Sequence, residues 1–352
     1  MAQFHSLTIK SVAKVTDNSV AITFDIPENL KEKFSFKAGQ YITLKTTING
    51  EDIRRDYSIC ASQNSGNVTV AVKAVENGTF SVYANNTLKA GDALEVAEPN
   101  GRFIFEANAA KTRTIAAFAA GSGITPVLSI AKTLLEEEPF SNFILVYGNK
   151  TLADTMFVDE LLQLKKQYDN RFHAHFIYSQ SQETDALFGR IEKSTVNLIV
   201  KNKYKGVTIE NFYLCGPEQM IHTVKDVLIE NGVKEKAIKF ELFTAPVEAS
   251  SDATTDLPSG ETKIKVVVDE EEFEFSMPQK QTILEAALKQ DIDAPYSCQG
   301  GICSSCIAKV TEGTAEMRQN NILTDSEVAE GLILTCQAHP TSATIAVDYD
   351  DV

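Results

Sequence analysis

Four cysteines near the C-terminus have the spacing of a metal-cluster site. Cys298, Cys303 and Cys306 share one short segment, with four and then two residues between successive cysteines, and Cys336 follows further along the chain. Three thiolates on one loop can hold one side of an iron–sulfur core while a distant thiolate binds the far iron. We therefore predict a [2Fe–2S] cluster, which passes electrons singly, and we expect the upstream part of the chain to supply those electrons.

A structural zinc site is the alternative for these cysteines. Zinc sites usually contain paired C-x2-C knuckles, and only Cys303 and Cys306 have that spacing. Gly300 and Gly301 precede them and permit a positive φ and a close approach of the backbone. Backbone N–H groups can then point at the sulfides of a cluster, so the sequence favours iron–sulfur over zinc.

Two segments in the N-terminal third predict a site for a flavin nucleotide. The run Arg55-Asp56-Tyr57-Ser58 closes an expected strand. A guanidinium can hold a pyrophosphate through a bidentate fork, a Tyr ring can stack on a flavin, and a Ser hydroxyl can hydrogen-bond near its reactive nitrogen. The run Gly78-Thr79-Phe80-Ser81 follows another strand and is expected to begin a helix, a natural seat for phosphate. A salt-bridged surface Arg is the alternative reading of Arg55 alone.

Two glycine-containing turns predict a second nucleotide site. The run Gly121 to Gly123 follows a buried strand, and we expect Thr125 to cap the next helix with Pro126 at its first position. Such a turn places a phosphate at a helix N-terminus in a sheet crevice. The run Cys215-Gly216-Pro217 ends a later strand and would face the same crevice, although a buried structural cysteine is the alternative. Cys60 receives that structural interpretation, within an apolar strand.

Charge and composition narrow the possible partners. Residues 261–352 carry 17 acidic and six basic side chains, which is −11 of the total net charge of −15. An acidic module argues against nucleic acid and suits a basic protein partner, although a merely soluble surface fits equally well. No apolar run is long enough for a membrane span, and the N-terminus lacks a signal-peptide pattern. With six unevenly clustered cysteines, we expect reduced thiols in a cytoplasm.

The order of expected elements divides the chain into three domains. Residues 1–107 are strand-rich, with runs at 7–26, 40–47 and 68–75, and predict an antiparallel barrel. In residues 108–245, expected strands alternate with expected helices, which predicts a parallel α/β sheet. The strands are at 113–119, 143–147, 172–178 and 212–215, one helix reaches residue 135, and two others span 154–168 and 217–231. Residues 246–262 read as an acidic linker. Residues 263–352 form the last domain, with strands at 264–268 and 272–275 and a helix at 283–289.

Together these motifs resemble the ferredoxin–NADP reductase superfamily fused to a plant-type ferredoxin domain, over essentially the whole chain. The resemblance implies a β-barrel FAD domain, an α/β NAD(P) domain and an α+β β-grasp domain that holds the cluster. It implies a flavin role for Arg55, Tyr57 and Ser58, and Gly78, Phe80 and Ser81 favour FAD over FMN. The further residues that it assigns to nucleotide binding or to the hydride path are Gly121, Gly123, Thr125, Pro126, Gly148, Asn149, Lys150, Cys215, Gly216, Pro217 and Glu241.

The resemblance also implies an electron path and a class of acceptor. NADPH or NADH reduces FAD, the cluster receives the electrons, and a partner oxygenase accepts them. The run Tyr147-Gly148-Asn149-Lys150 and the domain order look most like the reductases of phenylacetyl-CoA epoxidases. Related reductases serve ketosteroid hydroxylases, acyl desaturases and the hybrid-cluster protein, and a zinc-stabilised interaction module on a flavin-binding body is the alternative from another class. Ser179-Gln180-Ser181 lacks the Arg that NADP-preferring relatives carry there, so a 2′-phosphate would rely on Lys150 or Arg190.

Overall fold

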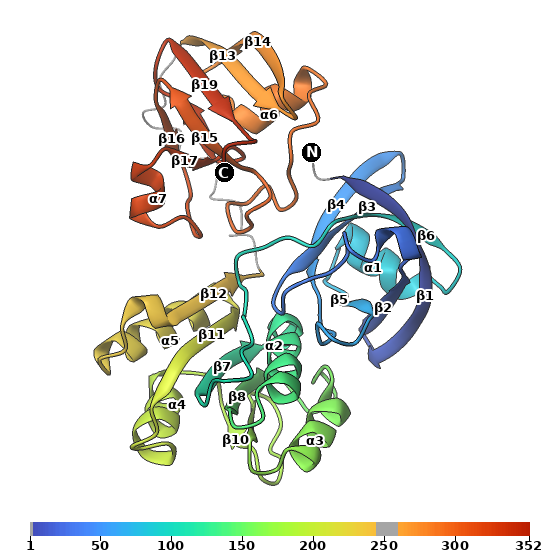
Figure 1. Ribbon diagram of the computed structural model, residues 1–352, viewed down its shortest axis with the longest axis vertical. Coiled ribbons are helices and arrows are strands. Elements are labelled where there is room, and N and C mark those ends of the chain that lie inside the picture. The colour runs from blue at the N-terminus through green and yellow to red at the C-terminus, as the bar shows by residue number, and fades with distance from the viewer. Residues whose placement is uncertain (1–2, 244–259) are drawn as a thin grey trace. The chain divides into compact units, whose positions relative to one another are not determined.

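The computed structural model describes residues 3–243 and 260–352, in two compact units (Figure 1). Residues 4–243 form the first unit, called the body below, and residues 260–352 form the described part of the second, called the C-terminal module. Most of the predicted linker, residues 246–259, lies outside the described residues. The predicted boundary at residue 107 stays a prediction. In the described ranges, no helix combines the length and apolar character needed to cross a membrane.

The body begins with an antiparallel barrel, as predicted. Its strands are β1 (Phe4–Thr16), β2 (Ser19–Asp25), β3 (Tyr41–Ile48), β4 (Glu51–Ser58), β5 (Val68–Lys73) and β6 (Ala93–Ala97), in the order β4-β3-β6-β1-β2-β5. An antiparallel bridge from Ile59 to Val70 joins the end of β4 to β5 and closes the ring. Alternate residues such as Leu7, Ile9 and Ile22 point into the barrel and are fully buried, which is why these segments form strands.

Two details of the predicted barrel are wrong. The run 7–26 is two strands, because the chain turns at residues 17–18 and β2 pairs back on β1. Cys60 does not lie in a strand but just beyond β4, where its N–H donates to the Thr69 carbonyl at 2.9 Å. It is nevertheless buried, as the structural interpretation requires. A 3-10 turn (Glu28–Leu30) and helix α1 (Thr79–Asn86) complete the barrel region.

The second half of the body is a parallel sheet, as predicted, and it has six strands where the sequence predicted four. Its strands are β7 (Thr114–Ala120), β8 (Asn142–Asn149), β9 (Phe172–Tyr178), β10 (Leu187–Phe188), β11 (Ile209–Gly216) and β12 (Ile238–Leu242), in the order β10-β9-β8-β7-β11-β12. Every neighbouring pair is parallel. The strand order reverses direction between β7 and β11. The carboxyl ends of these two strands therefore mark the switch point, where open α/β sheets bind ligands in a crevice.

Four helices flank this sheet: α2 (Ile124–Glu137), α3 (Val158–Gln167), α4 (Lys193–Asn197) and α5 (Glu218–Glu230). Two shorter turns accompany them, a π-helical turn at Leu198–Lys203 and a 3-10 turn at Glu235–Ala237. The helix expected over 154–168 begins later, at Val158. Thr151 and Asp154 form a turn in which the Thr hydroxyl donates to the carboxylate at 2.7 Å. Phe157 then has a φ of 60°, which no α-helical residue adopts, so the helix can begin only after it.

Helix α2 holds the barrel through the loop that follows β4. Ser129, which is fully buried, donates to the Ala61 carbonyl at 2.6 Å, and Lys132 donates to the Cys60 carbonyl at 3.2 Å. One helical turn later, Gln63 donates to the Glu137 carboxylate at 2.6 Å. The helix that begins at the predicted nucleotide turn therefore also fixes the chain just beyond Ser58.

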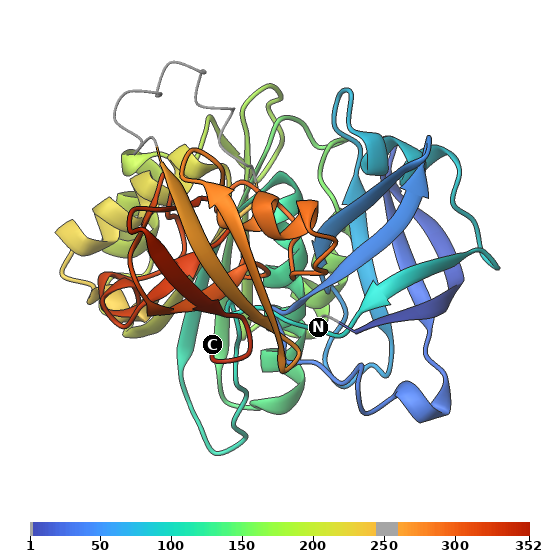
Figure 2. The same ribbon diagram turned by 90° about the horizontal axis from the view of Figure 1, so that it is seen from above.

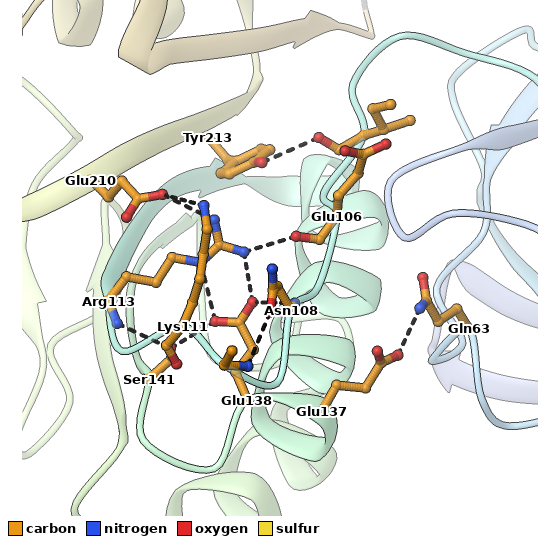
Figure 3. Close-up of polar contacts among 12 residues, drawn as sticks. Gln63, Glu106, Asn108, Lys111, Arg113, Glu137, Glu138, Ser141, Glu210 and Tyr213 are labelled. Carbon is orange, nitrogen blue, oxygen red and sulfur yellow. Dashed lines mark hydrogen bonds and ion pairs between the residues drawn. The ribbon is translucent and has the colours of Figure 1, made fainter.

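A buried ion pair fixes the segment that joins the barrel to the sheet (Figure 3). Arg113 donates through two nitrogens to the Glu138 carboxylate, at 2.6 and 3.1 Å, and also donates to the Glu106 carbonyl at 2.8 Å. Ser141 and the Asn108 N–H complete the carboxylate's hydrogen bonds. The Arg113 side chain is 7% exposed and that of Glu138 is fully buried. The pKa of Glu138 is lowered because these hydrogen bonds outweigh its desolvation.

The C-terminal module is a mixed sheet packed on a helix, as the β-grasp prediction requires. Strands β13 (Glu261–Val268), β14 (Glu271–Pro278), β15 (Ile307–Glu312), β17 (Leu332–Leu334) and β19 (Thr344–Asp348) lie in the order β14-β13-β19-β15-β17. A second pair is β16 (Ala315–Met317) with β18 (Ala338–Pro340), and α7 spans Asp325–Ala329. Helix α6 (Ile283–Lys289), orange beside the orange strands in Figure 2, contributes Ile283 and Ala287 to the module's core.

Candidate functional site

The end of β4 brings the predicted flavin residues to the edge of the barrel. Because side chains alternate along a strand, the Arg55 side chain is exposed while that of Ser58 is buried. Tyr57 packs on Phe80, with ring centroids 5.5 Å apart and the rings tilted by 34°. Burial raises the pKa of Tyr57, so its hydroxyl stays neutral at physiological pH. An exposed guanidinium, a neutral aromatic ring and a buried hydroxyl are thus available on one strand.

Helix α1 begins beside them, at the residues predicted to seat a diphosphate. Gly78 precedes the helix, and a Cβ at this position would overlap the Ser81 hydroxyl. That hydroxyl accepts a hydrogen bond from the Val75 N–H at 3.2 Å. The first N–H groups of a helix lack internal partners and favour an anion. The local sequence therefore builds a glycine-lined helix start that can accept phosphate oxygens.

The turn after β7 lies at the switch point of the sheet. Gly121–Gly123 form a 3-10 turn, and α2 begins at Ile124. Gly121 has a φ of 55°, and its carbonyl accepts a hydrogen bond from Tyr147 at 2.9 Å. A Cβ on Gly123 would overlap the carbonyl of Cys215, so only glycine lets the turn pack against the end of β11.

The prediction that Thr125 caps this helix is wrong. Gly123 occupies the cap position and Thr125 lies in the first turn, where its hydroxyl donates back to the Ser122 carbonyl at 3.0 Å. Pro126 accordingly lies inside the first turn, where the N–H that it lacks has no helical partner. The helix start still lies at the switch point of the sheet, two residues earlier than expected.

The end of β8 carries Gly148, Asn149 and Lys150 to the same edge of the sheet. The backbone carbonyl of Asn149 accepts from the Ser179 N–H at 3.0 Å, and that of Lys150 accepts from the Gln180 N–H at 2.8 Å. Gly148 leaves room for Ile191, which would lie 3.2 Å from a Cβ there. The segment expected to discriminate between NADPH and NADH is therefore bonded directly to the strand end that bears Lys150.

Ser58, Cys215 and Glu241 come together from three distant parts of the chain. The Ser58 hydroxyl donates to Oε2 of Glu241 at 3.2 Å. Cys215 on β11 is the direct neighbour of Glu241 on β12 in the parallel register. Beyond Cys215, Gly216 has a φ of 155° beside Ala120, and Pro217 immediately precedes α5. The barrel and the sheet thus share one polar cluster at the switch-point crevice.

Both acidic groups in this cluster hold their protons. Burial raises the pKa of Glu241 to about 8, the Ser58 hydrogen bond opposes that shift, and the nearby negative charge of Asp56 adds to it. Burial, and then the charge of Glu241, raise the pKa of the Cys215 thiol well above its usual value. At neutral pH the cluster therefore contains a carboxylic acid, a hydroxyl and a thiol, all uncharged. Such a site can donate hydrogen bonds and a proton without repelling a hydride donor.

The four C-terminal cysteines lie around one irregular loop. Cys306 precedes β15 and Cys336 lies in the turn between β17 and β18, and both are buried, whereas Cys298 and Cys303 are partly exposed. Thr335 donates to the Cys306 carbonyl through its N–H at 3.1 Å and through its hydroxyl at 2.9 Å. The thiols of Cys306 and Cys336 share a hydrogen bond that raises the pKa of Cys306.

The loop fits an iron–sulfur cluster by its donors and by its backbone. All six cysteines are free thiols. Across the described part of the chain, no three His, Cys, Asp or Glu side chains are already gathered closely enough to hold a metal ion. Gln299 and Gly301 have φ values of 51° and 70°, and the Gly300 N–H donates to the Cys298 sulfur at 3.3 Å. N–H groups directed at sulfur are the environment that such clusters require.

Sequence reasoning overlooked two residues of these sites. Asp56 lies inside the motif at the end of β4, where it accepts a hydrogen bond from Thr43 at 2.6 Å and raises the pKa of Glu241. Gln337 follows Cys336 and donates to the Gln299 carbonyl at 3.0 Å. Each stands beside a residue that was singled out, and that adjacency is the one signal that could have drawn attention to it.

Three family models match the chain in the order of its domains. An oxidoreductase FAD-binding domain matches residues 6–105, an oxidoreductase NAD-binding domain matches 118–226, and a 2Fe-2S iron-sulfur cluster binding domain matches 266–341. The first covers the barrel, the second begins in β7, and the third contains all four cysteines of the irregular loop. FAD, a nicotinamide nucleotide and a [2Fe–2S] cluster are therefore the cofactors of this chain.

Relatives and solved structures share this architecture over nearly their whole length. The chain is 38% identical to a subunit of the 1,2-phenylacetyl-CoA epoxidase of Escherichia coli K12, over 99% of both chains. It is 30% identical to the ferredoxin reductase component of 3-ketosteroid-9-alpha-monooxygenase from Rhodococcus rhodochrous, over 97% of this chain and 96% of the relative. Phthalate dioxygenase reductase superposes with a TM-score of 0.62 at 25% identity, over 98% of both chains. The chain therefore belongs to the ferredoxin–NADP reductase superfamily, among the reductases that carry a C-terminal [2Fe–2S] domain.

Proposed function

We propose that this protein is the reductase component of a di-iron phenylacetyl-CoA epoxidase and delivers electrons from NAD(P)H to it. The proposal of a reductase reaction is supported most directly by the hydrogen bond from Ser58 to Glu241, beside Cys215, where the barrel meets the sheet. The choice of acceptor is supported by the 38% identity to a component of the Escherichia coli epoxidase over 99% of both chains.

The residues at the barrel edge bind the flavin. Arg55 and Ser81 hold the diphosphate, the guanidinium through its charge and the serine at the start of α1. Tyr57, backed by Phe80, offers an aromatic face. On the other side of the crevice, the turn Gly121 to Gly123 and the first turn of α2 hold the phosphates of the nicotinamide nucleotide.

When bound, FAD accepts a hydride from NAD(P)H and the [2Fe–2S] cluster passes the electrons on singly. Ser58 donates a hydrogen bond through its hydroxyl to Glu241, and protonated Glu241 holds a proton beside the reacting region. Cys215 lines the hydride path as a neutral thiol that excludes water from the end of β11. Because none of the three groups is charged at neutral pH, they orient the reactants without attracting counter-ions.

In the C-terminal module, Cys298, Cys303, Cys306 and Cys336 ligate the cluster. The surface of this module is strongly acidic, with a net charge of −11 over residues 261–352. Such a field steers a basic partner to the module and speeds its association. An oxygenase component with a basic face is the partner that this charge favours.

A ketosteroid hydroxylase is the second candidate acceptor, because the Rhodococcus relative is 30% identical over nearly the whole chain. The two candidates differ in their oxygenase components, which can be purified separately. We expect the reduced protein to support product formation by the epoxidase component with phenylacetyl-CoA. Turnover of a ketosteroid by the hydroxylase component at an equal or higher rate would instead assign the second acceptor.

The reductase reaction is tested by reducing the protein anaerobically with NADPH and with NADH. We expect the flavin and iron–sulfur absorption bands both to bleach. The coenzyme that bleaches them at the higher rate is the preferred one. Ser58→Ala should slow flavin bleaching about 100-fold, as loss of one preorganised donor does, and should leave the FAD content unchanged. Ser65→Ala, in the next loop, is the matched control and should react at the parent rate. Bleaching of Ser58→Ala at the parent rate would remove Ser58 from the mechanism.

A further inference from the structure

Gln337 connects the two parts of the cysteine site. It follows Cys336 in the turn between β17 and β18, and its side chain is half-buried. Its Nε2 donates to the backbone carbonyl of Gln299 at 3.0 Å and lies 3.8 Å from the sulfur of Cys336, within reach of an N–H···S hydrogen bond. Gln299 belongs to the loop that carries the other three cysteines. One primary amide, which has two N–H donors, therefore spans the loop and the distant ligand.

The backbone of Gln337 is fixed on both sides. Its N–H donates to the Leu334 carbonyl at 2.8 Å, and its carbonyl accepts from the Arg318 N–H at 3.0 Å. Its Cγ would lie 3.1 Å from a Cβ on Gly301, so it packs directly on that glycine. The side chain thus leaves a rigid turn and has little room to choose another direction.

The partner of this amide is a strained residue. Gln299 has a φ of 51°, in the left-handed region that is costly for a residue with a Cβ. A hydrogen bond to its carbonyl offsets part of that cost. The Gln299 carbonyl and the Gly300 N–H belong to the same peptide group. By bonding to that carbonyl, the side chain of Gln337 therefore helps to hold the group in the orientation that directs the Gly300 N–H at the Cys298 sulfur, 3.3 Å away.

We propose that Gln337 is a positioning residue that raises the reduction potential of the cluster, by donating to the Cys336 sulfur and by holding the Gln299 peptide. This proposal rests on ligation by the four cysteines. Reduction adds negative charge to the ligating sulfurs, and N–H donors stabilise that charge more in the reduced state than in the oxidised state. Removing one donor therefore favours the oxidised state. A residue that only filled space would leave the potential unchanged.

Two substitutions separate donation from packing. Gln337→Met keeps the length and volume of the side chain but removes both N–H groups. Gln337→Glu also removes them and adds a negative charge beside Cys336. We expect the potential to fall in the order parent, Gln337→Met, Gln337→Glu. The ratio of reduced to oxidised cluster at a fixed potential should drop about tenfold in Gln337→Met, which is about 59 mV for a one-electron couple. Gln290→Met, at an exposed position after α6, is the matched control and should keep the parent potential.

The experiment is a spectroelectrochemical titration of the full-length holoprotein, with iron content and the electron paramagnetic resonance spectrum of the reduced state measured on the same samples. Iron content reports whether the four cysteines hold a cluster, and the potential reports what Gln337 does to it. The expected order, among variants that retain iron, supports the proposal. If Gln337→Met loses its iron, the proposal is tested by comparing the reduction potential of Gln337→Glu with that of the parent. Equal potentials, or a higher potential in either variant, would overturn the proposal.

Discussion

The flavin–nucleotide site of the body and the cysteine site of the C-terminal module are built in opposite ways. Ser58 and Glu241 are 183 residues apart, and they meet because strands from a barrel and from a parallel sheet end at one crevice. Three of the four cysteines instead share one loop, whose shape depends on left-handed residues such as Gln299 and Gly301. The first site is a product of tertiary packing, and the second is a product of local backbone conformation.

This difference teaches where each site is vulnerable. Damage to packing far from the crevice should reach the flavin–nucleotide site, because α2 and the segment before β7 hold barrel and sheet together. The cysteine site should respond to changes in its own loop and to little else. Three substitutions, taken from the largest expected effect to the smallest, test that contrast.

Cys336→Ser should abolish electron delivery to the acceptor while leaving the body intact. A serine hydroxyl is a poor replacement for a thiolate ligand, so we expect iron and acid-labile sulfide to be lost and reduction of a one-electron acceptor protein to fall to background. Flavin bleaching by NAD(P)H should proceed at the parent rate. Cys60→Ala, which removes a buried thiol of the body, is the control and should keep its iron. A lower rate of flavin bleaching in Cys336→Ser than in the parent would show that the two sites are not independent.

Arg113→Met should destabilise the body by about 3–5 kcal/mol, because it leaves the Glu138 carboxylate buried without its partner. Urea unfolding followed by circular dichroism measures this, since the chain has no tryptophan. Lys193→Met breaks an ion pair whose side chains are 61% and 55% exposed, and should cost less than about 1 kcal/mol. The cluster spectrum should be unchanged in both. Similar losses for the two pairs would contradict the importance that we give to the buried one.

Glu241 should make the stability of the body depend on pH. Its pKa is about 8 in the folded state against an ordinary value of 4.5, so between these values the folded chain binds more protons than the unfolded chain. Its stabilising contribution is complete below about pH 4.5 and is lost as the pH rises through about 8, with a slope of at most about 1.4 kcal/mol per pH unit. Glu241→Gln lacks this proton, so the Tm of the FAD-free parent should fall relative to the variant from pH 6 to 9. If the Tm of the parent and that of Glu241→Gln changed with pH in the same way, the Glu241 carboxyl would be exposed to water and not buried.

Much of the fold could be predicted because its segments carry strong local signals. The buried strand Phe172–Tyr178 and the helix Ile283–Lys289 have the bounds that the apolar pattern predicts. The late start of α3 could not be predicted, because it depends on the left-handed conformation of Phe157, a residue type that rarely adopts it. The division of the run 7–26 was missed because Asp17-Asn18 is a short turn inside an otherwise strand-like pattern.

The candidate sites could be predicted as residues but not as an arrangement. The cysteine spacing alone indicated the cluster, since three of its four predicted ligands are nearly contiguous in the chain. The pairing of Ser58 with Glu241 depends on how the end of β4 meets β12, and that of Arg113 with Glu138 on how the end of α2 packs beside the start of β7. No local pattern reports either arrangement. The raised pKa of Glu241 was equally hidden, because burial of a carboxyl group is a property of the folded structure.

The position of β12 has a consequence for how the protein is made. This edge strand pairs with β11 alone and is the last strand of the body to leave the ribosome. Domains fold from the N-terminus during synthesis, so the barrel can close long before Glu241 exists. Until β12 arrives, β11 presents an open edge that can pair with a strand of another chain. Nascent chains in which β11 has emerged from the ribosome and β12 has not are therefore the ones most exposed to aggregation. Completion of the reductase site and protection of its sheet occur in the same step, the emergence of β12.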